Sequence, residues 1–428
     1  MKRFLIALGL SASLVATPLI AQVTIPQVPQ INANDLFQDI VGGVPTPNSQ
    51  YASVPLVGNL AFTQYGAAVG NALVGGDFGT NLFQRGTSVV LASPAAEAYE
   101  SADRWAVWGG TNTPVTTSQQ TGSTDIVANS TASFRVNKAS GAGVVPVCIA
   151  QEVESANSTQ FQGQTAEFSF YAKAGSTFSA ANSALNAYIT YGTGTDDGMQ
   201  KLAYTVNAGG GGSTAWAGGA NAAAVTATLS SGGFNRYTVT ANIPATATEI
   251  GVTLCYTPVG TGTSTDWFEI ALAQLDINPA FTSRTVTGGS IFTNDVRAKA
   301  FMARPQAIET ALQQRYFYNL AEPAAGVVVA TGVLTSTTQC SLGIPLPVPM
   351  RAVPTLGTTG TLSTSTWQIQ ETTTSTLASS SFIAALTAAS TTTVMGWNAK
   401  LTTASTAGWA CQLQGAGGTS SLTASAEL

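Results

Sequence analysis

Histidine is absent from this chain of 428 residues, and charged residues are scarce. The absence of histidine excludes Ser-His and Cys-His nucleophile pairs and zinc sites with histidine ligands. It also removes the side chain that most often acts as a general base. Charged residues make up 9% of the sequence, and 16 lysines and arginines stand against 21 aspartates and glutamates. Because a nucleic-acid partner needs a cationic surface to neutralise its phosphates, this composition argues against one.

Hydrolysis by paired carboxylates needs only aspartate and glutamate, so the lack of histidine does not exclude it. No pair of acidic residues stands out by its motif, however, and function follows from a site and not from a fold. We therefore predict a protein that is not an enzyme and has no catalytic residue. A polysaccharide depolymerase is the less favoured alternative.

Short alternating segments dominate the middle of the chain. Apolar and polar residues alternate over 166–172, 236–241, 249–256 and 266–275. Such alternation, bounded by Gly and Asn turns, predicts half-buried antiparallel strands. Many short strands with no helical stretch between them indicate an all-β fold. We predict an antiparallel jelly-roll β-sandwich over residues 69–284.

The regions around this sandwich have different compositions. Residues 1–21 carry Lys2 and Arg3 before an uncharged apolar run, which is typical of a secretory signal peptide; the alternative is an apolar N-terminal anchor. Residues 22–68 are rich in Pro, Gln and Asn and predict an extended docking arm. In residues 319–428, Ser/Thr tracts alternate with large apolar residues, which predicts a C-terminal β-domain.

A connector over residues 285–318 contains the one convincing helix, predicted at 304–315 with Pro305 in its first turn. Ile308, Leu312 and Tyr316 recur at four-residue spacing and form an apolar stripe. The stripe is expected to pack either against the sandwich or against the same stripe of symmetry mates in an oligomer.

Two motifs link the start of the sandwich to this helix. The first is Asn81-Leu-Phe-Gln-Arg-Gly-Thr-Ser88 followed by Ser101-Ala-Asp-Arg-Trp105, preceded by a GDF tripeptide at 76–78. The second is the Arg-Pro…Gln-Arg-Tyr-Phe-Tyr segment over 304–318. In order and spacing they resemble a family of bacteriophage and prophage virion appendage proteins, tail-fibre-like or head-fibre-like. The resemblance covers roughly residues 69–428.

This resemblance implies a structural virion protein whose jelly roll is of the carbohydrate-binding-module type. It implies a homotrimer that docks to other virion proteins through its N-terminal arm and binds a host cell-surface polysaccharide. The rival hypothesis is a secreted bacterial carbohydrate-binding protein or adhesin, exported by residues 1–21. The two hypotheses place the same sandwich in different compartments, the virion or the cell exterior.

The four cysteines bear on that choice. If they are oxidised, the simplest pairing is Cys148 with Cys255 and Cys340 with Cys411, one bond in each β-domain. The favoured interpretation is instead four small buried thiols, because virions assemble in a reducing cytoplasm.

Exposed aromatic rings are the usual platform for sugars, which present an apolar face. Trp216, Trp108 and Tyr188 are the predicted carbohydrate-binding residues. Trp216 leads because it lies in a Gly-rich loop that offers it nothing obvious to pack against.

Within the first motif, Asp77, Arg85, Asp103 and Arg104 are predicted to form structural ion pairs that fix the edge of the first strand. No cofactor is expected, although calcium is possible, and Asp196 and Asp197 are weak candidate ligands. Two adjacent carboxylates fall short of the six to eight oxygens that calcium takes, so a solvated turn is the favoured interpretation of this pair.

Overall fold

The computed structural model describes residues 71–428, apart from the short segments 80–82, 92–97, 111–113, 139–142, 199–215, 261–265, 361–366, 372–376, 386–389 and 402–403. The chain divides into two compact units, Met1–Val69 and Gly70–Leu428. The predicted N-terminal segments 1–21 and 22–68 lie outside the described residues. In the described part of the chain, no helix is both long and apolar enough to span a membrane.

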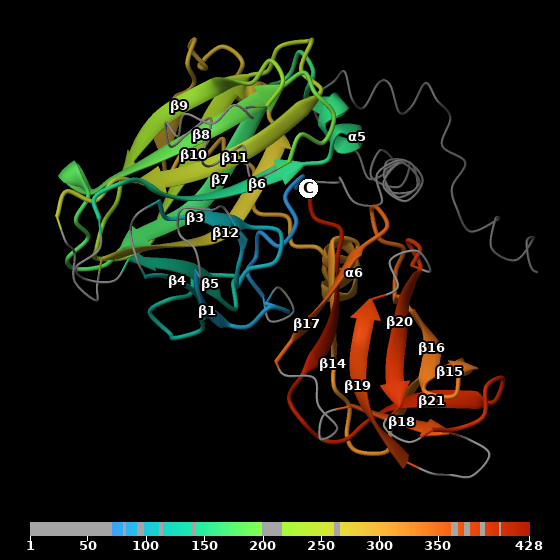
Figure 1. The fold of residues 1–428 in the computed structure, drawn as a ribbon. Helices are drawn as coiled ribbons and strands as arrows, with labels where there is room; N and C mark the ends of the chain where they lie inside the picture. Colours follow the sequence, from blue (N-terminus) through green and yellow to red (C-terminus); the bar gives the residue numbers. More distant parts are fainter. Residues whose placement is uncertain are drawn as a thin grey trace, which may run out of the picture. The chain divides into compact units, whose positions relative to one another are not determined.

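Two antiparallel sheets form a sandwich in the first part of the second unit (Figure 1). The first sheet has seven strands in the order β1-β4-β5-β12-β7-β10-β13. Their bounds are β1 Ser88–Val90, β4 Val115–Gln120, β5 Ser133–Lys138, β7 Thr165–Ala174, β10 Asn235–Asn242, β12 Trp267–Ile277 and β13 Ser290–Thr293. Because β13 pairs with β10, the sandwich extends beyond the predicted boundary at residue 284.

The second sheet has six strands in the order β2-β3-β6-β11-β8-β9. Their bounds are β2 Ala98–Tyr99, β3 Ala106–Trp108, β6 Val147–Val153, β8 Ala184–Gly192, β9 Ala220–Thr228 and β11 Glu249–Tyr256. A short helix, α5 (Ser155–Ser158), and the 3₁₀ turns Thr159–Phe161, Ala181–Ser183 and Pro279–Phe281 complete this part.

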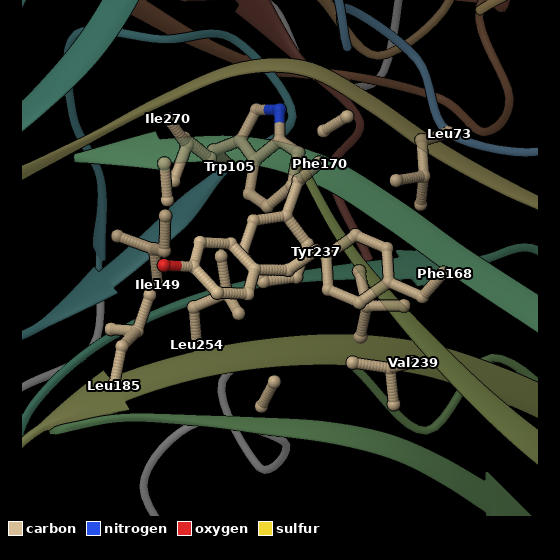
Figure 2. Close-up of a cluster of buried hydrophobic side chains, with 14 of the residues drawn as sticks. Leu73, Trp105, Ile149, Phe168, Phe170, Leu185, Tyr237, Val239, Leu254 and Ile270 are labelled. Carbon is tan, nitrogen blue, oxygen red and sulfur yellow. The ribbon is translucent and has the colours of Figure 1, made fainter. Parts of the chain in front are cut away.

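The alternation in each strand sends one set of side chains between the two sheets. Phe168 and Phe170 of β7 and Tyr237 of β10 meet Ile149 of β6 and Leu254 of β11 in a single apolar core (Figure 2). Period-two alternation makes this sorting automatic once the register is set. The predicted all-β class, with an antiparallel sandwich, a short connecting helix and a C-terminal β-domain, is confirmed.

The C-terminal β-domain contains a closed barrel, β15-β16-β20-β19-β18-β21, and a three-stranded sheet, β14-β22-β17. The barrel strands are β15 Val328–Ser336, β16 Gln339–Pro345, β18 Trp367–Glu371, β19 Leu377–Ala385, β20 Val394–Leu401 and β21 Ala410–Gly415. The sheet strands are β14 Phe317–Ala321, β17 Thr355–Thr359 and β22 Ser421–Ser425. Trp367, Trp397 and Leu413 belong to a second core that fills this domain.

The connecting helix, α6, spans Gln306–Gln314, but the face that it buries is not the predicted one. Ile308 is 40% exposed and Leu312 is half-buried, whereas Glu309 and Gln313 are buried. Tyr316 is buried, but it lies beyond the end of the helix. The predicted apolar stripe is therefore not the buried face of α6 within one chain, and its packing against symmetry mates stays a prediction.

A polar network explains this orientation. The Glu309 carboxylate accepts hydrogen bonds from Gly75 N and from Arg304 Nε, the latter at 2.5 Å. Arg304 also donates to Asn71 O at 2.7 Å and to Leu73 O. The helix thus holds the chain entering the sandwich through charge-assisted hydrogen bonds, which require Glu309 to face inward.

Both suggested cysteine pairs are disulfide-bonded, Cys148 with Cys255 and Cys340 with Cys411, so the favoured interpretation of free thiols is wrong. Cys148 and Cys255 are direct register partners on β6 and β11. Cys340 and Cys411 both lie in the core of the C-terminal domain. Strand register brings the first pair together, whereas Cys340 and Cys411 lie on β16 and β21, the two strands that flank β15 in the barrel.

Candidate functional site: the outer face of the six-stranded sheet

Strand pairing places two tyrosines on either side of a strip of small residues on the outer face of the six-stranded sheet. Reading across the strands, Tyr99 pairs with Ala106, Ala106 with Ala150, Ala150 with Thr253, and Thr253 with Tyr188. The three residues between the tyrosines are small and buried, whereas both tyrosines are half-buried. We call Ala106, Ala150 and Thr253 the floor.

The next row on this face holds Trp108, Cys148 and Cys255, which are paired across β3, β6 and β11. Trp216 packs against this row and against the floor, in one cluster that also includes Tyr99 and Tyr188. The structure thus brings together all three predicted carbohydrate-binding aromatics, Trp108, Tyr188 and Trp216. Their binding role stays a prediction.

The expected exposure of Trp216 is wrong. Its side chain is 2% exposed, and Nε1 donates a hydrogen bond to Gly198 O at 3.1 Å. Trp108 is also buried. The reason is the cluster itself: the small floor residues leave room for an indole, and burial of a ring of this size is strongly favoured.

The open part of the face lies on β8 and β9, beside Tyr188. Ala224 is the cross-strand partner of Tyr188 and is exposed, so no large neighbour on β9 covers the phenol ring. Asn186 and Thr226 follow on the same face, and Thr226 Oγ1 donates to Asn186 Oδ1 at 2.9 Å. An aromatic ring next to amide and hydroxyl groups is therefore accessible here.

Two buried carboxylates lie at the opposite end of this face, on β6 and β11. Among the described residues, neither oxygen of Glu152 has a hydrogen-bond partner, and Glu249 uses only Oε1, which accepts from Asp197 N at 2.7 Å. Burial, with a smaller contribution from the neighbouring Glu249, raises the pKa of Glu152 to about 8. Burial also raises the pKa of Glu249.

Asp196 and Asp197, the weak calcium candidates, organise a turn. Asp196 Oδ1 accepts from Ser155 N at 2.8 Å, and its Oδ2 accepts from Arg351 Nη1 at 3.1 Å. Asp197 Oδ2 accepts from Ala217 N at 2.6 Å. Across the described residues, no group of three or more acidic, cysteine or histidine side chains is placed to hold a metal ion, so the calcium hypothesis gains no support.

The charged residues of the first motif connect the sandwich to the C-terminal domain. Arg85 forms ion pairs with Asp103 at 2.8 Å and with Glu427 at 3.0 Å, and Arg104 forms one with Glu427 at 2.7 Å. Asp77 instead accepts from Gly79 N at 3.3 Å, and burial raises its pKa. Arg85 and Arg104 therefore also join the sandwich to the C-terminal domain through Glu427.

Ring contacts extend this connection. The Arg85 guanidinium lies 3.6 Å from the ring centroid of Phe317, and that of Arg104 lies 3.8 Å from the ring centroid of Tyr316. The two motifs noted in the sequence thus meet in space, Arg85 and Arg104 from one and Tyr316 and Phe317 from the other. We call Arg85, Arg104 and Glu427 the clasp.

Sequence reasoning missed Tyr99, Glu152, Glu249 and Glu427. A signal existed for Glu152, because alternation along β6 places it on the same face as Cys148. Tyr99 and Glu249 are recognisable only from the pairing of distant strands, and Glu427 only from the packing of the last residues against the sandwich.

The outer face of the seven-stranded sheet is organised differently. Trp267 lies under the Arg135 guanidinium, 4.1 Å from the ring centroid. Arg135 and Lys173 both pair with Glu269, at 3.2 Å and 3.0 Å. Because the cations and carboxylates here satisfy each other, this face is a poorer candidate for a ligand site.

No protein-family model and no curated protein sequence matches the chain. Among solved structures, the chain is similar to the enzymatically active domain of tailspike protein 4 of bacteriophage CBA120, at 13% identity and a TM-score of 0.26, over 48% of this chain and 21% of that one. A CBM22–GH10 xylanase fragment of Clostridium thermocellum shares 14% identity at a TM-score of 0.24, over 41% and 26% of the two chains. A CBM22 xylan-binding domain shares 16% identity at a TM-score of 0.23, over 43% and 96%.

The chain thus spans about a fifth of the tailspike chain and about a quarter of the xylanase chain. At these TM-scores the similarities carry no argument about function. The fold assignment rests on the strand pairing described above.

Proposed function

We propose that this protein binds glycans, without catalysis, through the outer face of its six-stranded sheet. The observation that carries the proposal is the half-buried ring of Tyr188, which has the exposed Ala224 as its neighbour on β9 and lies beside Asn186 and Thr226 on the same face. A pyranose ring has an apolar face and an equatorial rim of hydroxyls, so it suits an aromatic edge next to amide and hydroxyl groups.

Binding is favoured over hydrolysis by the environments of the two carboxylates on this face. A glycosidase separates its two acidic groups into a protonated acid and an ionised base or nucleophile. Burial shifts the pKa values of Glu152 and Glu249 in the same direction instead. A depolymerase would lower the viscosity of a bound polysaccharide over time, and we expect no such change.

The biological setting that we propose is a virion appendage attached by its N-terminal arm, because the motif resemblance runs through both β-domains. A secreted bacterial adhesin is the second candidate, and one observation favours it. Two buried disulfides are typical of an oxidising compartment, and the N-terminal sequence resembles an export signal.

Light scattering on the full chain separates these settings. A stable trimer supports the fibre role and gives the exposed Ile308 side chain a partner. A monomer whose N-terminus begins near residue 22, after expression in a cell that exports proteins, supports the adhesin.

Glycan binding itself is tested by affinity electrophoresis through gels containing soluble β-glucan, mannan or galactan. Tyr188→Ala removes the half-exposed ring, and we expect binding to weaken about tenfold, the upper range for one aromatic contact. Tyr171→Ala is the matched control, because Tyr171 is a half-buried tyrosine on β7 of the other sheet. Equal retardation of the two variants would contradict the assigned face.

A further inference from the structure

Residues 426–428, which follow β22 of the C-terminal domain, lie against the sandwich. Glu427 belongs to the clasp, and the next residue, Leu428, reaches the outer face of the six-stranded sheet. Tyr99 Oη donates a hydrogen bond to the main-chain oxygen of Leu428 at 3.1 Å. Tyr99 is one of the two tyrosines that flank the floor, so residue 428 directly holds one ring of this face.

Leu428 also lies beside the residue that holds Trp216. A Cβ atom at Gly198 would lie 3.6 Å from the carbonyl carbon of Leu428. Gly198 O in turn accepts the hydrogen bond from Trp216 Nε1 at 3.1 Å. Leu428 therefore contacts Tyr99 directly and is one residue away from Trp216.

A single side chain of the C-terminal domain keeps these residues in place. Arg351 donates through Nε to Ala426 O at 3.2 Å and through Nη2 to Glu427 O at 3.1 Å. Its Nη1 donates to Asp196 Oδ2 at 3.1 Å, two residues before Gly198. Because a guanidinium presents its donors in a rigid planar fork, Arg351 fixes the spacing between residues 426–427 and the turn at 196–198.

The backbone that carries Arg351 is itself restrained. Pro349 and Pro354 lie on either side of it, and proline fixes its own φ angle. Arg351 N also donates to Arg315 O at 2.9 Å, just after α6. The guanidinium therefore projects from a well-defined segment.

We propose that Arg351 is a positioning residue for the glycan site, which seats residues 426–428 against Tyr99 and Gly198 and thereby sets the orientation of the Tyr99 and Trp216 rings. This inference rests on the proposed glycan-binding function. Trp216 and Tyr188 belong to one packed cluster, so a shift of the indole displaces the ring assigned to the ligand. Since a binding site tolerates displacements of only about 0.5 Å, glycan affinity depends on a residue outside the binding face.

The test uses the full chain in affinity electrophoresis with β-glucan, mannan and galactan, and follows the polysaccharide that retards the unchanged protein most. Arg351→Gln removes the planar donor set, and we expect about fivefold weaker binding, the effect of one lost hydrogen bond. Tyr99→Phe keeps the ring and removes only the donor to Leu428, and we expect about threefold weaker binding.

The double variant distinguishes positioning from two separate effects. Both single changes break the same connection, so the double variant should bind within about twofold of Arg351→Gln. Independent effects would instead multiply, to about fifteenfold weaker binding.

Arg236→Gln is the matched control on the seven-stranded sheet. Like Arg351, Arg236 joins an acidic side chain to two main-chain oxygens: it pairs with Glu167 at 3.9 Å and donates to Ala298 O at 3.4 Å and to Lys299 O. We expect this variant to lose stability in urea as Arg351→Gln does, but to keep its glycan affinity within about twofold. If Arg351→Gln does not fold, Arg351→Lys, which keeps the charge without the planar fork, takes its place.

Unchanged affinity in either single variant, multiplied losses in the double variant, or equal weakening in Arg236→Gln overturns this inference and leaves glycan binding intact. Absence of binding of the unchanged protein to all three polysaccharides overturns the proposed function, and the inference with it.

Discussion

Loss of the Glu427 carboxylate should weaken the attachment of the C-terminal domain to the sandwich. Glu427 is the common partner of Arg85 and Arg104, and the Arg104 side chain is only 1% exposed. Glu427→Gln keeps the side-chain shape and removes the charge. Arg104 then retains its bond to Glu152 O at 2.9 Å and its contact with Tyr316, while Arg85 retains Asp103.

The magnitude follows from the burial of the pair. Removing one partner of a buried ion pair costs about 3–5 kcal/mol, because the remaining charge is left uncompensated. Since the glutamine carbonyl still accepts one hydrogen bond and both arginines keep other contacts, we expect about 3 kcal/mol of lost unfolding free energy. An exposed pair such as Lys299–Asp276, in which Lys299 is 40% exposed, contributes about 1 kcal/mol or less.

Urea unfolding followed by tryptophan fluorescence measures this difference. Both domains contain buried tryptophans, Trp105 in the sandwich and Trp367 in the barrel, so each reports its own transition. We expect Glu427→Gln to separate two transitions that coincide in the unchanged protein, while Lys299→Gln leaves them together. If Glu427→Gln costs no more than Lys299→Gln, the clasp does not hold the domains together.

Three further predictions concern stability. The pKa of Glu152 is about 8 in the folded protein, against a usual value of 4.5. Its contribution to the free energy of unfolding is therefore complete below about pH 4.5 and is lost as the pH rises toward 8. In chemical denaturation at several pH values, Glu152→Gln should make this decline in stability less steep. Replacing Cys340 and Cys411 by alanine opens a loop of 71 residues and should cost about 2–4 kcal/mol, visible as a lower urea midpoint; any remaining response to reductant then comes from Cys148–Cys255. Gly76→Ala should cost about 1–3 kcal/mol or more, because its Cβ would lie 1.9 Å from Ala273 O, whereas Gly260→Ala, with open space around it, should change the midpoint little.

The sequence alone determined the fold class, since period-two alternation needs no partner strand to be recognised. It also predicted the location of the short helix and the two candidate cysteine pairs. The scarcity of charge correctly drew attention to Arg85, Asp103 and Arg104, because a chain with few charged residues uses them at specific positions. The structure explains why the motif has glycine at position 76, because a Cβ atom there would lie too close to the Ala273 carbonyl.

Tertiary structure decided everything that depends on the register between distant strands. The buried face of α6 is set by the hydrogen bonds of Glu309 with the Gly75 amide and with Arg304. The spacing of apolar residues along a helix cannot predict such contacts. The burial of Trp216 required a floor of small residues that three separate strands assemble. The glycine-rich sequence around Trp216 predicted an exposed ring because the sequence does not show the surface on which the indole packs. That surface exists only after the strands of the sheet have paired.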